Sequence, residues 1–192
     1  MRRLTLDTNA LIDLEAQDPT RPALLELASA HREKRVRLCV PAIIASERQQ
    51  GPLLSNFTQF QERLTRGGIA DAEVLPTMGR FGLAYYDWFV WADEGMAALE
   101  EDIHHVLFPD RESDYARHAD AMRLPRDGEI EPGWRNRRCD VLAMWSHITY
   151  GADAFVTSDD NFHRPVKRAA LLGLGAKVIV TPESALSLLR SA

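Results

Sequence analysis

Short apolar runs alternate along the chain with longer segments in which apolar residues recur every three or four positions. The short runs predict β-strands, because each is brief and most end at a polar corner or a proline; they span residues 4–6, 36–40, 72–75, 154–156 and 177–180. Helical spacing is found at 10–14, 22–34, 42–50 and 57–66, from Asp140 onward, and after Thr181-Pro182. Alternating strands and helices predict an α/β fold, a three-layer sandwich with a central, mainly parallel β-sheet flanked by helices.

The middle of the chain is less regular. Residues 81–108 are first rich in aromatic side chains and then acidic, and we predict one or two long helices there. Residues 109–132 are polar and bracketed by prolines, which is typical of an insertion or a mobile loop. We therefore expect a single domain over residues 1–192, with an insertion around 81–136.

Composition adds limits on the class of protein. With 192 residues, 45% of them hydrophobic, the chain can bury a full core. Its net charge of −5 argues against a globally basic nucleic-acid binder, although a basic rim around an acidic centre would be hidden in that sum. Cys39 and Cys139 form no CxxC pair and are expected as buried thiols. His104, His105 and His118 lack a metal-ligand spacing and are expected at the surface.

The chain begins with two arginines but reaches Asp7 too soon for a secretory segment. No stretch approaches the roughly 20 apolar residues of a membrane span. We therefore expect a soluble, cytoplasmic protein that does not enter a membrane.

Four acids are predicted at one edge of the sheet. Asp7 follows the first strand, and Asp159 ends the strand at 154–156. Glu47 lies near the start of the helix after the second strand, one turn after Ile43 and Ile44, and Asp140 opens a helix. Because the carboxyl ends of parallel strands meet at one edge, these side chains should converge. Each acid also has an ordinary reading, Asp7 as a helix N-cap and Glu47 as a solvated residue on a helix face.

Converging carboxylates repel one another unless cations compensate their charge. Hard oxygen ligands suit Mg²⁺ or Mn²⁺, and one or two such ions could activate water for attack on a phosphodiester. Cationic residues flank two of the acids in sequence, and Arg138, Arg164 and Lys167 are candidates for binding a phosphate backbone. The alternative for these cations is a solvated charge run.

Together these motifs resemble a known family. The pattern Leu-Asp-Thr-Asn-Ala-Leu-Ile at 6–12, Glu47 after Val40-Pro41, Asp140, and Val-Thr-Ser-Asp-x-x-Phe at 156–162 look like the PIN domain. This metal-dependent nuclease fold includes the ribonuclease toxins of bacterial toxin-antitoxin pairs. The resemblance covers residues 1–50 and 137–190, and leaves the longer middle segment without a counterpart.

The resemblance implies roles for particular residues. Asp7, Glu47, Asp140 and Asp159 would be both the catalytic and the metal-binding set. Asn9 and Thr157 match polar positions that brace the first and last acids, and Ser158 would add a hydroxyl. The family often has a further acid where this chain has Asn161, and Asp160 is the candidate to replace it.

Three functional hypotheses follow. The first is a Mg²⁺- or Mn²⁺-dependent endoribonuclease that acts on RNA, with an antitoxin protein as partner if the chain is a toxin, and with a homodimer as an open alternative. The second is a non-catalytic PIN-like module that binds RNA or protein, with residues 81–91 as the interface. The third is a phosphatase with Asp7 as nucleophile, a chemistry that uses a second acid where this chain has Asn9.

Overall fold

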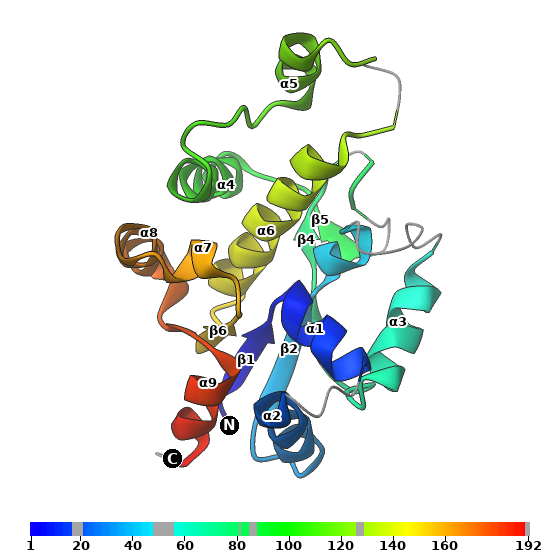
Figure 1. The fold of residues 1–192 in the computed structure, drawn as a ribbon, viewed down its shortest axis with the longest axis vertical. Helices are drawn as coiled ribbons and strands as arrows, with labels where there is room; N and C mark the ends of the chain where they lie inside the picture. Colours follow the sequence, from blue (N-terminus) through cyan, green and yellow to red (C-terminus); the bar gives the residue numbers. More distant parts are fainter. Residues whose placement is uncertain (17–20, 48–55, 81, 85–87, 126–128, 191–192) are drawn as a thin grey trace.

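The computed structural model describes residues 1–16, 21–47, 56–80, 82–84, 88–125 and 129–190. Five parallel strands form the central sheet in the order β3-β2-β1-β6-β7 (Figure 1). The sheet confirms the predicted α/β class. Its strands are β1 (Arg3–Leu6), β2 (Arg37–Pro41), β3 (Glu73–Leu75), β6 (Ala154–Val156) and β7 (Ile179–Val180).

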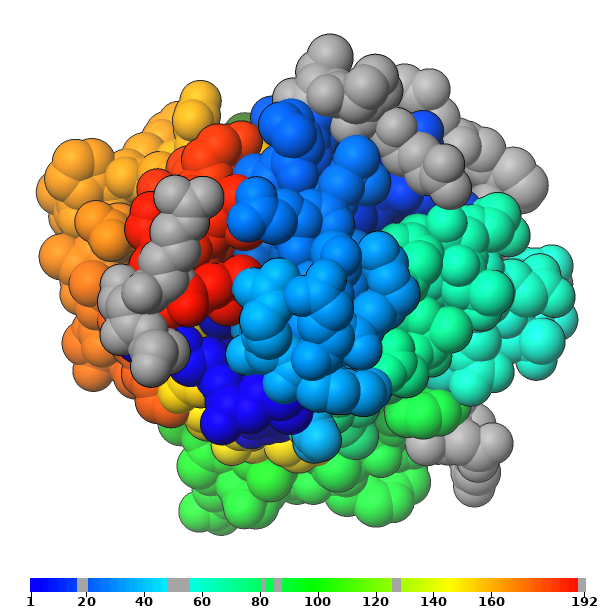
Figure 2. All heavy atoms as spheres, turned by 90° about the horizontal axis from the view of Figure 1, so that it is seen from below, coloured from blue at the N-terminus to red at the C-terminus, as the bar shows by residue number. Residues whose placement is uncertain are grey.

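Helices cover both faces of this sheet. Alternate strand residues point to opposite faces, so Leu4 and Leu6 of β1 join one apolar cluster, whereas Phe155 of β6 joins the other. The first cluster is covered by α1 (Thr8–Glu15), α2 (Pro22–Arg32), α3 (Phe57–Arg66) and α9 (Pro182–Arg190). In Figure 2, which views the molecule from below, α2 lies between α9 and α3.

The second face is covered mainly by α6 (Pro132–Thr149), which packs against α4 (Glu94–Leu107). Proline at the first helical position and the Glu131 carboxylate start α6, since Glu131 accepts hydrogen bonds from the backbone N–H groups of Gly133 (2.7 Å) and Trp134 (2.6 Å). Asp140 therefore lies in the middle of this helix. The prediction that it opens the helix is wrong, because the capping residues stand in the polar stretch before it.

After β6, three short helices lead to the last strand. They are α7 (Asp160–His163), α8 (Pro165–Leu171) and the π-helix η3 (Leu172–Ala176). In Figure 1, α7 and α8 lie beside α6, on the side away from α3. The α7 helix begins immediately after Asp159, whose carboxylate caps it by accepting a hydrogen bond from the Asn161 N–H (2.8 Å).

Other boundaries also differ from prediction. The segment at 42–50 forms only the 3-10 helix η1 (Ala42–Ser46), which Glu47 ends; residues 48–50 lie outside the described part. Part of the segment at 81–108 is not helical, since β5 (Phe89–Val90) pairs with β4 (Thr77–Met78). Residues 81 and 85–87 of that segment lie outside the described part. The predicted loop at 109–132 contains α5 (Tyr115–Met122), which the Asp114 carboxylate caps.

Both cysteines are buried free thiols, as predicted. His105 is exposed, whereas His104 is buried, and the Nε2 of His104 lies 2.8 Å from the Arg111 carbonyl in the segment after α4. The prediction of a surface residue is therefore wrong for His104. Among the helices of the described residues, none is long and apolar enough to cross a membrane.

Candidate functional site

Asp7 lies at the carboxyl end of the central strand. Only 3% of it is exposed, and its backbone N–H donates to the carbonyl of Val156 on the neighbouring strand (3.0 Å). Its Oδ1 accepts a hydrogen bond from the Thr8 N–H (2.8 Å), and its Oδ2 accepts one from the Thr157 hydroxyl (2.6 Å). Burial raises the pKa of Asp7 to about 6, although both hydrogen bonds act against this increase.

Glu47 is linked to Asp7 through Thr8, and the region around these acids at the carboxyl edge of the sheet is called the acidic corner below. The Thr8 hydroxyl donates to Glu47 Oε2, so Thr8 holds Asp7 through its backbone N–H and Glu47 through its side chain. Burial raises the pKa of Glu47 to about 7, and the negative charges of Asp7 and Asp159 add to the increase. The 3-10 helix η1 therefore does what an α-helix was expected to do, which is to bring this acid back to the edge of the sheet.

Asp159 follows the strand that pairs with β1. Its backbone N–H donates to the Thr157 hydroxyl (3.0 Å), and the same hydroxyl donates to Asp7, so Thr157 connects the two acids. The first and fourth acids thus flank the boundary between β1 and β6, where the strand order reverses direction. In open α/β sheets, ligands bind at such a switch point.

Asp140 reaches this edge from α6. Burial raises the pKa of Asp140 well above its usual value, followed by the charges of Asp7, Glu47 and Asp159, while Arg137 lowers it. Each of the other three acids therefore lies within electrostatic range of Asp140. The four predicted acids therefore lie within electrostatic range of one another.

The acid that faces this corner after β6 is Asp159. Its charge contributes to the raised pKa values of Asp7, Glu47 and Asp140. Asp160 is exposed in the first turn of α7, and the Asn161 amide oxygen accepts a hydrogen bond from Lys167 Nζ (2.6 Å). Neither neighbour is among the groups that raise the pKa of the other acids.

The chemistry of the donor set suits a hard divalent cation. The negative charges of the four carboxylates raise the pKa values of Asp7, Glu47 and Asp140, so the group gains from a shared positive charge. Each carboxylate oxygen can accept more than one partner. The arrangement of the side chains does not match this donor chemistry. Within the described residues, no group of three or more His, Cys, Asp or Glu side chains is arranged so that it could hold a metal ion.

The predicted substrate-binding cations lie in two different places. Arg164 is exposed at the junction of α7 and α8. Lys167 Nζ also donates to the Leu107 carbonyl, and the charge of Asp159 acts on the Lys167 pKa, which puts this ammonium near the acidic corner. Arg138 is 3% exposed and its guanidinium donates to Glu100, so it belongs to the packing of α4 on α6.

Of the supporting residues, Thr157 bridges two acids, Ser158 is half-buried beside Asp159, and Asn9 is exposed. Sequence reasoning missed Thr8, which holds both Asp7 and Glu47. Its position inside the polar Asp7-Thr8-Asn9 corner was the available signal, but the bond to Glu47 depends on the path of η1.

Comparison of the chain with models of protein families, with curated proteins and with solved structures finds no match.

Proposed function

We propose that the protein is a divalent-metal-dependent endoribonuclease that hydrolyses RNA phosphodiester bonds at the corner formed by Asp7, Glu47, Asp140 and Asp159. The observation that supports this function best is the mutual electrostatic influence of the four acids at the carboxyl edge of a parallel sheet. The PIN-like motifs of the sequence supply the reaction class.

In this proposal the carboxylates hold Mg²⁺ or Mn²⁺ as oxygen ligands. When bound, such an ion supplies positive charge that favours attack of water on a phosphodiester and departure of the leaving oxygen. Thr8 and Thr157 orient Glu47 and Asp7 through the hydrogen bonds described above. Arg164 and Lys167, next to Asp159, would bind the phosphate backbone of the RNA.

The test is cleavage of end-labelled single-stranded RNA by the purified chain with Mn²⁺ or Mg²⁺, and with EDTA. We expect cleavage only with the metal. Asp7→Asn and Asp140→Asn each remove a charged ligand. Loss of a residue that only supports a metal ligand typically lowers activity roughly 10- to 100-fold, and we expect each of these variants to lower the rate by at least as much.

Asp102→Asn is the matched control, because Asp102 is an exposed acid on α4. This variant should cleave like the wild type. Calorimetry with Mn²⁺ gives a second readout, in which Asp140→Asn should show no heat of binding. The circular dichroism spectrum of this variant should match that of the wild type, which would show that the fold is kept. Full activity in EDTA, or in both acid variants, would contradict the proposal.

The non-catalytic module remains the alternative from another functional class. A chain that gives no Mn²⁺ heat and no cleavage but retains RNA in a gel-shift assay would support that reading. If the protein is a toxin, a partner protein should suppress its cleavage of RNA. Co-expression of the protein with small genes that neighbour its own gene tests this. The phosphatase reading would require a phosphoryl group trapped covalently on Asp7.

A further inference from the structure

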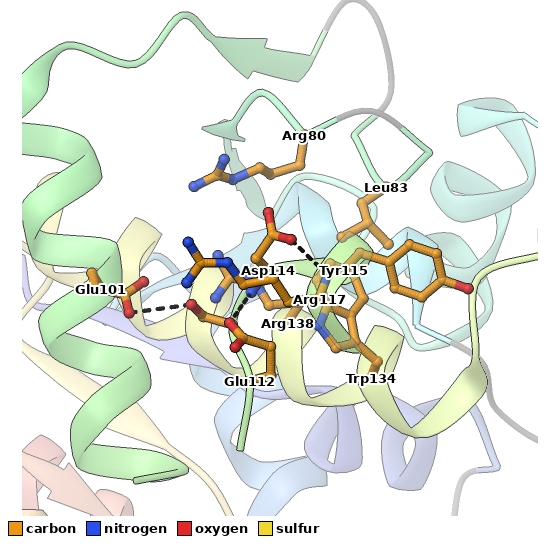
Figure 3. A pocket seen from close by; sticks show the side chains of 10 residues that line it. Arg80, Leu83, Glu101, Glu112, Asp114, Tyr115, Arg117, Trp134 and Arg138 are labelled. Carbon is orange, nitrogen blue, oxygen red and sulfur yellow. Dashed lines mark hydrogen bonds between the residues drawn. The ribbon is translucent and has the colours of Figure 1, made fainter. Parts of the chain in front are cut away.

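A second candidate site lies away from the acidic corner. A cavity of about 510 Å³ opens between α4, α5 and the first half of α6, in the segment without a counterpart in the PIN-like motifs (Figure 3). In Figure 3, Glu101 approaches the cavity from α4, whereas Tyr115 lies on the opposite side, with Arg80 above and Trp134 below. The volume is in the range of small-molecule sites.

Two buried N–H donors on α6 lack acceptors in this wall. Trp134 is 7% exposed and Arg138 is 3% exposed. Within the described residues, neither Trp134 Nε1 nor Arg138 Nε has a hydrogen-bond partner. A buried donor without a partner is costly, about 1–3 kcal/mol, and is uncommon unless a ligand or water completes it. The two residues stand four positions apart, so they share one face of the helix.

The wall of the cavity also carries two cationic side chains, Arg80 and Arg138. The guanidinium groups of Arg80 and Arg138 both donate to one buried carboxylate, that of Glu100. Burial lowers the pKa of Arg80, and the neighbouring charge of Arg138 lowers it further, while Glu101 and Asp114 act in the opposite direction. An oxyanion at this wall would lie against both cations, beside the two donors that have no partner.

The rim of the cavity has the opposite character. The carboxylate of Glu101 accepts from the Ser113 hydroxyl (3.2 Å), that of Glu112 from the Asp114 N–H (3.0 Å), and that of Asp114 from the Arg117 N–H (2.9 Å). These carboxylates keep free lone pairs toward the cavity. The half-buried ring of Tyr115 and the exposed guanidinium of Arg117 add flat surfaces.

We propose that this cavity binds a nucleoside monophosphate, with the phosphate against Trp134 and Arg138 and with hydroxyl or amino groups of the nucleoside at the acidic rim. An oxyanion alone would leave the rim acceptors unused, and a free amino acid would leave most of the volume empty. The same chemistry could come from a free nucleotide or from the 5′-phosphorylated end of an RNA.

The site is separate from the acidic corner. Arg138 and Asp140 are two residues apart on α6, so their side chains point about 200° apart around the helix. A nucleotide in the cavity would therefore contact the opposite side of the helix that carries Asp140. Binding there needs no metal and no cleavage, and the proposal is independent of the proposed nuclease activity.

The test is a titration of the whole chain, labelled with ¹⁵N at tryptophan, with AMP, GMP, CMP and UMP in EDTA. The chain has four tryptophans, and Trp134→Phe assigns the indole resonance of Trp134. We expect that resonance to shift on saturation with at least one nucleotide. The Trp145 resonance should stay in place, because its indole N–H already donates to the Met96 carbonyl (3.1 Å). The matching nucleoside, which lacks the phosphate, should bind at least about tenfold more weakly.

Calorimetry of variants completes the test. Trp134→Phe keeps an aromatic ring at this position but removes the N–H, and should weaken nucleotide binding by roughly 5- to 10-fold. Arg117→Gln, at an exposed position, should weaken it several-fold, whereas Trp91→Phe, outside the cavity, should leave it unchanged. Competition by a 5′-phosphorylated trinucleotide would identify an RNA end as the source, and its failure to compete would identify a free nucleotide. No shift at millimolar nucleotide, or wild-type affinity in both cavity variants, would overturn the proposal.

Discussion

At the scale of single residues, the acidic corner is a local conflict between charge and burial. Asp7, Glu47 and Asp140 all have raised pKa values, with burial as the largest cause. For an acid with a raised pKa in the folded state, the native protein binds protons more tightly than the unfolded chain. Stability is therefore lost as pH rises, between pH 4 and 6 for Asp7 and between about 4.5 and 7 for Glu47.

This conflict predicts that Asp140→Asn stabilises the metal-free protein. Asparagine is nearly the same size and removes one of the mutually repelling charges. At pH 8 in EDTA we expect the free energy of unfolding to rise by about 1 kcal/mol or more, or roughly 2–4 °C in Tm. Thermal unfolding followed by circular dichroism measures this.

The gain should shrink at pH 5, where the raised pKa values of Asp7, Glu47 and Asp140 let these acids bind protons in the folded protein. Asp102→Asn again serves as control and should change Tm very little, since it is exposed on α4. A variant at position 140 that is less stable than the wild type at pH 8, with the control unchanged, would show that the corner is not electrostatically strained.

At the scale of elements, α4 and α6 are joined by a buried ionic group. Glu100 is 1% exposed, and it accepts hydrogen bonds from Arg138 of α6 and from Arg80, which precedes α4. Breaking a buried pair by removing one charge is costly, because the partner charge stays buried without compensation. Two arginines depend on this single carboxylate.

We therefore expect Glu100→Gln to lower the free energy of unfolding by about 3 kcal/mol. The neighbouring Glu101 provides the matched control, since its side chain is 47% exposed and Glu101→Gln should cost less than about 0.5 kcal/mol. Urea unfolding of both variants at pH 7.5 checks the difference. Equal stability of the two variants would mean that solvent compensates both arginines.

The predictability of the fold also differs between elements. The central strands could be predicted because a buried parallel strand is a short apolar run with a polar end, as at residues 4–6 and 154–156. The start of α6 could not, because its cap, Glu131, stands in a polar stretch that resembles a loop. The β4–β5 pair and α5 were missed because two-residue strands and exposed helices leave little periodic pattern.

The site shows the same division. Asp7, Glu47 and Asp159 could be placed at one edge of the sheet from their positions after β-strands, whereas Asp140 was placed there by a helix start that the structure does not have. The partner of Arg138 could not, since a pairing with Glu100 across 38 positions depends on how two helices pack. The hydroxyl bridges of Thr8 and Thr157 likewise depend on the closeness of chain ends that are distant in sequence.

At the scale of the whole molecule, His147 links α6 to the central strand β1 and to η3, the segment before the last strand. It is fully buried on α6, with Nδ1 2.9 Å from the Thr5 hydroxyl of β1 and Nε2 2.9 Å from the Ala176 carbonyl of η3. Burial lowers the pKa of His147 to about 4. The folded protein therefore holds this imidazole neutral, while the unfolded chain takes up a proton near its ordinary pKa of about 6.5.

The dependence of stability on pH that is expected from His147 has the opposite sign to that expected from the acidic corner. As pH falls from about 6.5 to about 4, the unfolded state binds the extra proton, so His147 should remove up to about 3 kcal/mol of stability. Replacement by a non-titrating side chain should flatten this part of the pH profile. Between pH 7.5 and pH 5, we expect the free energy of unfolding to fall by about 2 kcal/mol less in His147→Gln than in the wild type. At pH 7.5 the variant itself should be less stable than the wild type, because its hydrogen bonds are altered.

Urea unfolding at both pH values measures the four free energies that this comparison needs. His105→Gln is the control, because His105 is exposed on α4 and should leave the pH profile unchanged. Should the wild type and His147→Gln lose the same stability on acidification, the acid sensitivity of the fold would have to come from groups other than this buried imidazole. A smaller loss in the variant would show that the buried imidazole between α6, β1 and η3 contributes to the acid sensitivity of the fold.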